Sequence, residues 1–343
     1  MSEPILEVRD LKLHYFTSKG AVRALDGLSF DLARGETLGL VGESGCGKTT
    51  TGVALLGMPS PPGRIVGGSI VIDGTQIVGL PDHELRKNVR WSKISMVFQG
   101  AMNCLTPVYT IRELMVETYR VHCGPEALDT ERHVNMAKLE ALMEKYVRLV
   151  GLSESVLGRY PHELSGGMKQ RVVIAMALFL EPKVIVMDEP TTALDVIVQA
   201  QILNLIKALK RDLGLSYIFI THDLSTEAEI ADRVMVMYAG KMAELGSSED
   251  IFGAAEGRKG PAHPYTQMLL ASTPRLHKRV SELAFIPGSP PDLIAPPSGC
   301  RFSPRCPFAK TKCRQLDPPM HELGAGHLVA CWKAMEDSEY ERS

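Results

Sequence analysis

One short Gly-rich segment has the residue types needed to bind phosphate. Residues 42–49 read Gly-Glu-Ser-Gly-Cys-Gly-Lys-Thr, the pattern Gly-x-x-x-x-Gly-Lys-Thr. There the glycines let backbone N–H groups point at phosphate oxygens, the lysine adds positive charge near the terminal phosphates, and the threonine hydroxyl can ligate magnesium. A chance Gly-rich turn is the alternative. We predict a nucleoside triphosphate site at Gly42, Glu43, Ser44, Gly45, Cys46, Gly47, Lys48, Thr49 and Thr50.

Two adjacent carboxylates end an apolar run further along the chain. Asp188 and Glu189 follow Val-Ile-Val-Met at residues 184–187, and Pro190 then forces the chain out of the strand. Ligands of parallel sheets gather at such strand ends. Alone, the pair could be an exposed acidic strand end. Downstream of a phosphate loop, we expect Asp188 to bind magnesium and Glu189 to polarise the attacking water.

A second phosphate-facing element is predicted at a helix start. Ser165 precedes Gly166 and Gly167, and the helix that follows extends to about Leu180. A serine cap and two glycines leave bare backbone donors at the positive end of the helix, which attracts a γ-phosphate. In isolation the segment could equally be a helix start softened by glycine.

Three further side chains lie where nucleotide and water are expected. Gln99 and His222 each stand at or just beyond the end of an apolar strand. A single Gln or His is more often structural, but both fall at the sheet edge that carries the phosphate loop. Tyr15 has the ring needed to stack on an adenine, and a core aromatic is its alternative.

The elements that would position these residues indicate an α/β fold. Alternating residues at 5–16 and 28–32 predict a small antiparallel β layer, whereas the apolar runs 37–41, 183–188 and 216–221 predict buried parallel strands. A helical pattern at 109–152 predicts an inserted helical subdomain. We place a nucleotide-binding domain at 1–258, with its helical insert at about 100–165, and a small loop-rich domain at 259–343.

Composition and charge narrow the classes of function. The chain has 343 residues and a net charge of −2, so nothing in its overall charge indicates nucleic acid as a partner. No apolar stretch reaches the length of a membrane span, and residues 1–10 lack the layout of a signal peptide. We therefore expect a cytosolic or peripheral membrane protein.

Four of the seven cysteines lie in the last 44 residues, at Cys300, Cys306, Cys313 and Cys331. The segment is rich in proline and has little apolar sequence, so a bound metal would supply the missing core. No pair has the Cys-x2-Cys spacing of zinc ribbons, and the spacing alone does not decide between zinc and an iron–sulfur cluster. Free or disulfide-bonded thiols are a third alternative. Arg301 and Arg305 would offset thiolate charge or belong to the solvated surface.

Taken together, these motifs resemble the ATP-binding-cassette family over residues 1 to about 253. Residues 42–49 resemble its Walker A loop, Gln99 its Q-loop, residues 164–167 its signature, residues 184–189 its Walker B strand, residues 193–195, which end at Asp195, its D-loop, and His222 its switch histidine. The resemblance implies a RecA-like P-loop NTPase core, with Mg2+ bound through Thr49, Gln99 and Asp188. It also implies catalytic roles for Lys48, Gln99, Glu189 and His222, and a head-to-tail dimer in which Ser165, Gly166 and Gly167 close over the partner's ATP.

Within that family the chain resembles the oligopeptide and dipeptide importer branch. The resemblance is carried by residues 164–171, 188–195, 263–266 and the cysteine segment, in which some members hold a [4Fe-4S] cluster. Met168 replaces the usual Gln, in agreement with this branch, whereas residues 98–103 lack a common Asp-Pro after Gln99.

The branch implies an ATPase subunit at the cytoplasmic face of the membrane. Its partners would be a second ATPase subunit, two permease subunits and, indirectly, an extracytoplasmic solute-binding protein. Zn2+ is the alternative to the cluster, and an oligosaccharide or another small solute is the alternative cargo. A soluble ATPase acting on nucleic acid or ribosomes, and a P-loop kinase, fit the motifs less well.

Overall fold

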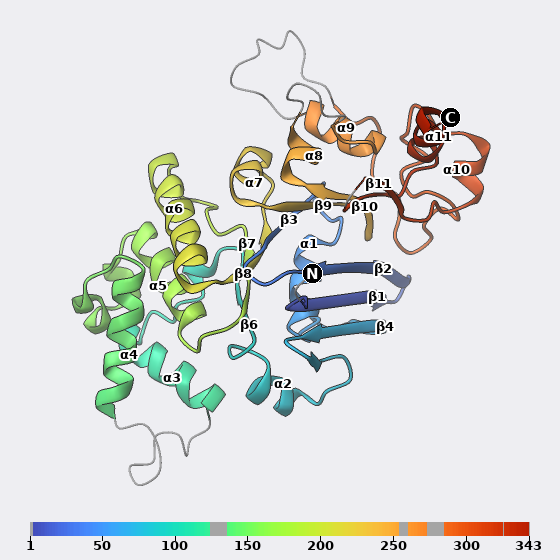
Figure 1. Ribbon diagram of the computed structural model, residues 1–343. Coiled ribbons are helices and arrows are strands. Elements are labelled where there is room, and N and C mark those ends of the chain that lie inside the picture. The colour runs from blue at the N-terminus through green and yellow to red at the C-terminus, as the bar shows by residue number, and fades with distance from the viewer. Residues whose placement is uncertain (1–2, 124–135, 254–259, 273–284, 325, 343) are drawn as a thin grey trace.

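The computed structural model describes residues 3–123, 136–253, 260–272, 285–324 and 326–342. In these residues the strands form two sheets, one of four strands in the order β2-β1-β4-β5 and one of eight in the order β11-β12-β10-β9-β3-β8-β7-β6 (Figure 1). The smaller, antiparallel sheet comprises β1 (Leu6–Thr17), β2 (Gly20–Leu32), β4 (Gly63–Ile72) and β5 (Thr75–Gln76). It confirms the predicted antiparallel β layer.

The larger sheet is mixed. Its strands are β3 (Thr37–Val41), β6 (Ile94–Val97), β7 (Val184–Asp188), β8 (Ser216–Ile220), β9 (Arg233–Tyr238), β10 (Lys241–Ser247), β11 (His321–Gly324) and β12 (His327–Val329). Strands β6, β7, β8, β3 and β9 pair in parallel, whereas β10, β12 and β11 add on antiparallel. The carboxyl ends of the parallel strands therefore meet at one edge, as the site predictions require.

The central strands are buried on both faces, and each face packs against a different group of helices. In β7, Ile185 and Met187 enter a core shared with the helices α3–α6, whereas Val184 and Val186 enter a core shared with α1 and the small sheet. Alternate side chains of a strand point to opposite faces, which explains this division. The bounds are α1 (Lys48–Leu55), α2 (Asp82–Asn88), α3 (Ile111–Cys123), α4 (Met136–Leu149), α5 (Gly166–Leu178), α6 (Val196–Leu213) and α7 (Leu224–Ile230).

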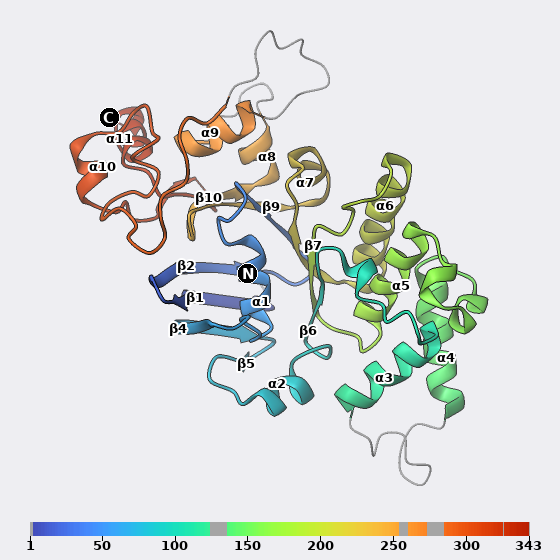
Figure 2. The same ribbon diagram turned by 180° about the vertical axis from the view of Figure 1, so that it is seen from behind.

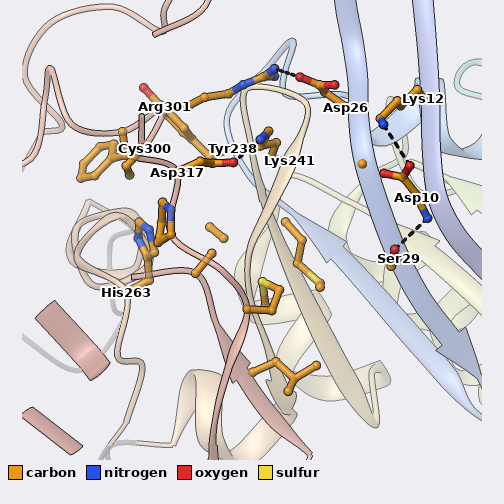
Figure 3. Close-up of a pocket in the computed structure, with 18 residues that line it drawn as sticks. Asp10, Lys12, Asp26, Ser29, Tyr238, Lys241, His263, Cys300, Arg301 and Asp317 are labelled. Carbon is orange, nitrogen blue, oxygen red and sulfur yellow. Dashed lines mark hydrogen bonds and ion pairs between the residues drawn. The ribbon is translucent and has the colours of Figure 1, made fainter. Parts of the chain in front are cut away.

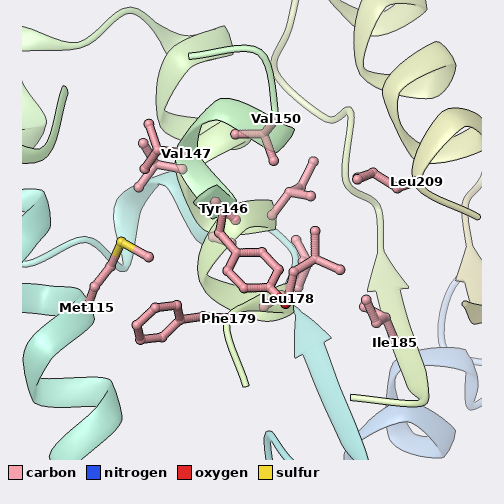
Figure 4. Packing of buried hydrophobic residues seen from close by; sticks show 14 of the residues in the cluster. Met115, Tyr146, Val147, Val150, Leu178, Phe179, Ile185 and Leu209 are labelled. Carbon is pink, nitrogen blue, oxygen red and sulfur yellow. The ribbon is translucent and has the colours of Figure 1, made fainter. Parts of the chain in front are cut away.

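In the described residues, the helices α3 and α4 confirm the helical pattern predicted within 109–152. Tyr146 and Val147 of α4 are buried against α3 and α5, and the Tyr146 and Phe179 rings meet edge to face with centroids 6.1 Å apart (Figure 4). Such aromatic pairs stabilise a core beyond their buried area. Short 3₁₀ helices at 101–103, 154–158 and 161–163 complete this part, and the predicted helical residues 124–135 lie outside the described residues.

The C-terminal region lies beside β10, β2 and the loop that precedes α1 (Figures 1 and 2). Helix α8 (Ser248–Phe252) directly follows β10, and the C-terminal region contains α9 (Pro264–Ala271), α10 (Thr311–Gln315) and α11 (Trp332–Arg342). Its strand β12 pairs with β10, so the region extends the main sheet. Tyr265 and Phe302 are fully buried there and pack with Tyr238 of β9. The division at 258/259 stays a prediction, since residues 254–259 are not described. Within the described chain, we find no helix with the length and apolar content that crossing a bilayer requires.

Candidate functional site

The phosphate loop follows β3 directly and ends where α1 begins. Gly42, Gly45 and Gly47 have φ angles of 147°, 78° and 111°, which only glycine adopts readily. At Gly42 a Cβ atom would lie 2.2 Å from the Met237 carbonyl oxygen, so there is also no room for a side chain. The Lys48 Nζ donates to the carbonyl oxygens of Gly42 at 2.7 Å and Glu43 at 3.1 Å. The loop therefore curls around its own lysine.

Asp188 ends β7 as a buried carboxylate suited to a cation. Its side chain is almost inaccessible and its Oδ2 has no hydrogen-bond partner in the described residues. Burial raises the pKa of Asp188, and the hydrogen bond with the Thr49 hydroxyl opposes that rise. An unpaired buried oxygen is costly, whereas carboxylate and hydroxyl oxygens are the donors that Mg2+ prefers. Thr49 and Asp188 thus fit the predicted magnesium site.

Glu189 is the meeting point of the predicted catalytic side chains. Its carboxylate accepts from Gln99 Nε2 at 2.8 Å, and its Oε1 lies 3.2 Å from His222 Nδ1. The backbone of Glu189 has a φ of 49°, and its N–H donates to the Ile220 carbonyl at 2.8 Å. A positive φ in a residue other than glycine is uncommon and concentrates at functional sites. The structure thus brings Gln99, Glu189 and His222 together from the ends of three strands.

Thr192 also belongs to this cluster, and the sequence analysis did not predict it. The Thr192 hydroxyl donates to the same Glu189 Oε2 at 2.9 Å and restrains the carboxylate. The only signal in the sequence is its spacing, three residues after Glu189. A threonine just past a strand is common in turns, which is why this signal is weak.

The cluster leaves Glu189 able to act on a water molecule. Its side chain is 17% exposed and that of His222 is 72% exposed, so both reach the surface where substrate would bind. A carboxylate whose orientation is restrained by two or three donors can accept a proton from a water within hydrogen-bond distance. This arrangement can therefore support hydrolysis.

The Ser165 segment forms the predicted helix start. Ser165 caps α5 and its hydroxyl accepts from the Met168 N–H at 3.3 Å. A Cβ atom at Gly167 would lie 2.8 Å from Val198 Cγ1 of α6, so this glycine also permits close helix packing. Asp195 caps α6 by accepting from the Val198 N–H at 2.9 Å. Helices α5 and α1 pack on opposite faces of the main sheet.

Tyr15 lies in β1 opposite Val22 of β2 and is half-buried. A Cβ atom at Gly63 of β4 would lie 2.7 Å from its ring, so this glycine makes room for it. The ring is thus neither fully in the core nor fully free, and its stacking on a base stays a prediction.

The four C-terminal cysteines line one cavity together with Phe302 and Trp332. All of them are free thiols. Burial raises the pKa of Cys300 to about 12. In the described residues no three His, Cys, Asp or Glu side chains lie close enough together to hold a single metal ion. The structure thus does not support the expected metal-binding domain, and what it shows in the described residues is four thiols that line one cavity.

The structure gives Arg301 and Arg305 other partners than those predicted from the sequence. Neither belongs to the solvated surface, because their exposed fractions are 5% and 8%. Arg301 is paired with Asp26 of β2, and Arg305 with Glu43 of the phosphate loop. Both arginines therefore form ion pairs with carboxylates of the nucleotide-binding part.

A cavity of about 560 Å³ lies where the C-terminal region meets β1, β2 and β10 (Figure 3). Polar groups rim it, including the Asp26–Arg301 pair and the Asp10–Lys12 pair, with Asp10 and Lys12 2.9 Å apart. Since the charges on its rim are paired with each other, the cavity has no evident preference for an anion or a cation.

Comparisons with known proteins agree with these motifs. Residues 25–192 match a family model described as "ABC transporter", and residues 243–313 match one described as "Oligopeptide/dipeptide transporter, C-terminal region". The chain is 44% identical to the oligopeptide transport ATP-binding protein OppD of Escherichia coli, over 98% of this chain and 95% of OppD. It is 43% identical to the dipeptide transport ATP-binding protein DppD of Bacillus subtilis, over 98% of this chain and 97% of DppD.

Solved structures are similar over the nucleotide-binding part. A dimeric ATP-binding cassette, MJ0796, bound to ADP and Pi superposes with a TM-score of 0.58 at 27% identity, covering 71% of this chain and 98% of that one. CbiO1 from Clostridium perfringens gives a TM-score of 0.61 at 26% identity, covering 74% and 92%. With its phosphate loop, its Asp188–Glu189 strand end and its Ser165 segment, the chain belongs to the ATP-binding subunits of ABC transporters.

Proposed function

We propose that this chain is the ATP-hydrolysing subunit of an importer of oligopeptides or dipeptides. The convergence of Gln99, Thr192 and His222 on the Glu189 carboxylate carries the hydrolytic part of the proposal. The relatives named for oligopeptide and dipeptide transport, which align along almost the whole chain, support the cargo class.

Each residue of the site has a defined task in hydrolysis. On ATP binding, the Lys48 ammonium would leave the loop carbonyls and contact the terminal phosphates. Thr49, Gln99 and Asp188 would hold Mg2+, which would neutralise phosphate charge. Glu189 orients and deprotonates the attacking water. His222, next to Glu189, contacts the γ-phosphate and keeps the water in line. Tyr15 stacks on the adenine.

The signature acts on the partner's nucleotide. The family resemblance of residues 164–167, and the similarity of the chain to a dimeric ATP-binding cassette, support a γ-phosphate contact between subunits. The amide groups after Ser165 would close over ATP held by a second ATPase subunit, and Asp195 would lie at that interface. Two permease subunits and an extracytoplasmic binding protein complete the importer, with this chain on the cytoplasmic face of the membrane.

We further propose that Cys300, Cys306, Cys313 and Cys331 hold a [4Fe-4S] cluster. The four thiols line one shared cavity. The resemblance of this segment to peptide-importer ATPases, some of which hold such a cluster, supports the cluster over zinc. The cluster would cross-link a region poor in apolar residues.

Peptide uptake in cells tests the function. In a strain that lacks this chain, uptake of labelled di- and oligopeptides should fall to background and should return with the wild type, not with Glu189→Gln. Unchanged peptide uptake combined with lost uptake of an oligosaccharide would reassign the cargo. ATP hydrolysis by the purified wild type would still support the ATPase role.

A further inference from the structure

The phosphate loop is attached by a side chain to a residue 262 positions further along the chain. The Arg305 guanidinium donates to both carboxylate oxygens of Glu43, with NH1–Oε2 at 2.6 Å and NH2–Oε1 at 2.9 Å. Two parallel, charge-assisted bonds fix direction as well as distance. Arg305 is 8% exposed and the Glu43 side chain is 24% exposed, so water screens this pair less than it screens a pair on the open surface.

The remaining donors of Arg305 are also used. Its Nε donates to the Pro287 carbonyl at 2.7 Å, and NH2 donates to the Ile286 carbonyl at 3.1 Å. NH1 also donates to the Tyr238 hydroxyl at 3.2 Å. With its donors shared among four groups, the guanidinium has one preferred position, and Glu43 is placed relative to it.

The backbone of the same loop residue is held from a second direction. The Glu43 N–H donates to the Tyr265 hydroxyl at 2.8 Å. Tyr265 is fully buried, and its ring packs against Tyr238 and Phe302 with centroids 4.6 Å and 5.4 Å away. The position of the hydroxyl is therefore set by the C-terminal core, and the first turn of the loop is set by that hydroxyl.

We propose that Arg305 and Tyr265, here called the C-terminal clamp, are positioning residues that keep the phosphate loop in its nucleotide-binding conformation. Neither needs to touch ATP. The clamp acts through Glu43, whose carbonyl also accepts from Lys48. The proposal rests on ATP binding by the loop, and it assigns to the C-terminal region a part in nucleotide affinity.

The expected rise in the Kd for ATP depends on how many molecules have the loop in its binding-competent conformation. An apparent dissociation constant rises in inverse proportion to the fraction of molecules in the binding-competent conformation. If loss of the Arg305–Glu43 pair leaves the loop competent in about a tenth of the molecules, the Kd for ATP rises about tenfold. Turnover at saturating ATP changes much less, because bound ATP selects the competent loop.

Equilibrium binding of a fluorescent ATP analogue and steady-state hydrolysis in the full-length protein test this proposal. Arg305→Gln is expected to raise Kd and KM about tenfold and to lower kcat less than twofold. Arg301→Gln is the matched control, because this buried arginine bonds Asp26 and the Ala239 carbonyl, outside residues 42–49. The control is expected to lower Tm while leaving Kd at the wild-type value.

Combining the Glu43 and Arg305 substitutions tests whether the two residues act through the same interaction or whether each destabilises the protein separately. Glu43→Gln and Arg305→Gln are expected to raise Kd by similar factors, and the double variant by no more than either alone, because both remove one interaction. Arg305→Lys, which keeps the charge, should recover part of the affinity. If Arg305→Gln does not fold, Glu43→Gln against Arg301→Gln gives the same test.

Three results would overturn the proposal. These are an unchanged Kd in Arg305→Gln, an equal rise in Arg301→Gln, or multiplicative effects in the double variant. A wild type that binds no ATP would instead refute the proposed function. A higher Kd in Lys48→Ala would confirm that the assay reports on the loop.

Discussion

The phosphate loop and the segment from Cys300 to Cys306 are both short turns with charged residues, yet they are held in place by different forces. The turns of the loop are set by its backbone, since it connects β3 to α1 and its glycines have positive φ angles, and Arg305 and Tyr265 hold Glu43 in addition. The cysteine segment has no strand or helix of its own, and buried ion pairs from Arg301 and Arg305 attach it to the rest of the molecule.

This difference implies different responses to substitution. In the loop, changing a side chain that is expected to contact phosphate, such as Lys48, should affect chemistry and leave the fold intact, because the glycine turns do not depend on that side chain. In the second, removing one partner of a buried pair leaves an uncompensated charge, which is strongly destabilising. Stability and nucleotide affinity should therefore respond there before turnover does.

The largest effect is expected at Glu189. Glu189→Gln should lower kcat for ATP hydrolysis by about 10²- to 10⁴-fold, the usual contribution of a general base, with little change in ATP affinity or Tm. The control is Glu117→Gln, at an exposed position of α3. Hydrolysis near the wild-type rate in Glu189→Gln would refute the assigned role.

Lys48 should show the next largest effect. Lys48→Ala removes a cation from the terminal phosphates, and we expect the Kd for ATP to rise about 10- to 100-fold, as for the loss of a charge-assisted hydrogen bond. Tm should stay close to that of the wild type, because the loop is fixed by its backbone. A large fall in Tm without ligand would show that the lysine also maintains the fold.

The third prediction concerns the cysteine segment, where we expect a substitution to affect both the bound group and the stability. Protein purified without oxygen should contain iron and sulfide and absorb visible light, and Cys306→Ser should lose all three and unfold several degrees lower. Cys104→Ser, at an exposed thiol, should retain them. A colourless wild type that contains zinc would overturn the cluster proposal.

The smallest expected effect is a pH dependence of stability that arises from the His327–Glu244 pair. The hydrogen bond to the fully buried Glu244 raises the pKa of His327 above 6.5. The pair therefore stabilises the fold fully below the unfolded pKa of about 6.5, and this contribution is lost as pH rises through the folded pKa.

Thermal unfolding of wild type and His327→Gln from pH 5 to 9 tests this. The difference in Tm should be a few degrees at pH 5.5 and should shrink toward pH 9. Burial lowers the pKa of His263 to about 4, but this histidine is present in both proteins, so its effect cancels in the difference. A difference that grows with pH would contradict the assignment.

The two regions also differ in how far the sequence predicts them. The bounds of β3, β7 and β8 agree with the apolar runs 37–41, 183–188 and 216–221 to within one residue, because a continuous apolar run is a local signal. Gln99 and His222 could be placed beside Glu189, since parallel strands end at one edge. The Thr192 contact depends on one rotamer, and local pattern does not predict it.

The partners of the C-terminal arginines were beyond prediction. Glu43 and Arg305 are 262 positions apart, and Asp26 and Arg301 are 275 apart. No periodic pattern connects such residues, and an arginine in a Pro-rich segment is usually solvated. The tertiary contacts of the C-terminal region, among them the packing of Tyr265 and Phe302 against Tyr238 of β9, bring the pairs together.

The structure of the assembled importer carrying Glu189→Gln, with Mg-ATP bound, tests the central claim most directly. We predict that the Ser165 hydroxyl and the amide groups after it lie within hydrogen-bond distance of the γ-phosphate of an ATP held by the phosphate loop of the other ATPase subunit. An ATP-bound assembly in which Ser165 lies far from every γ-phosphate would contradict the account.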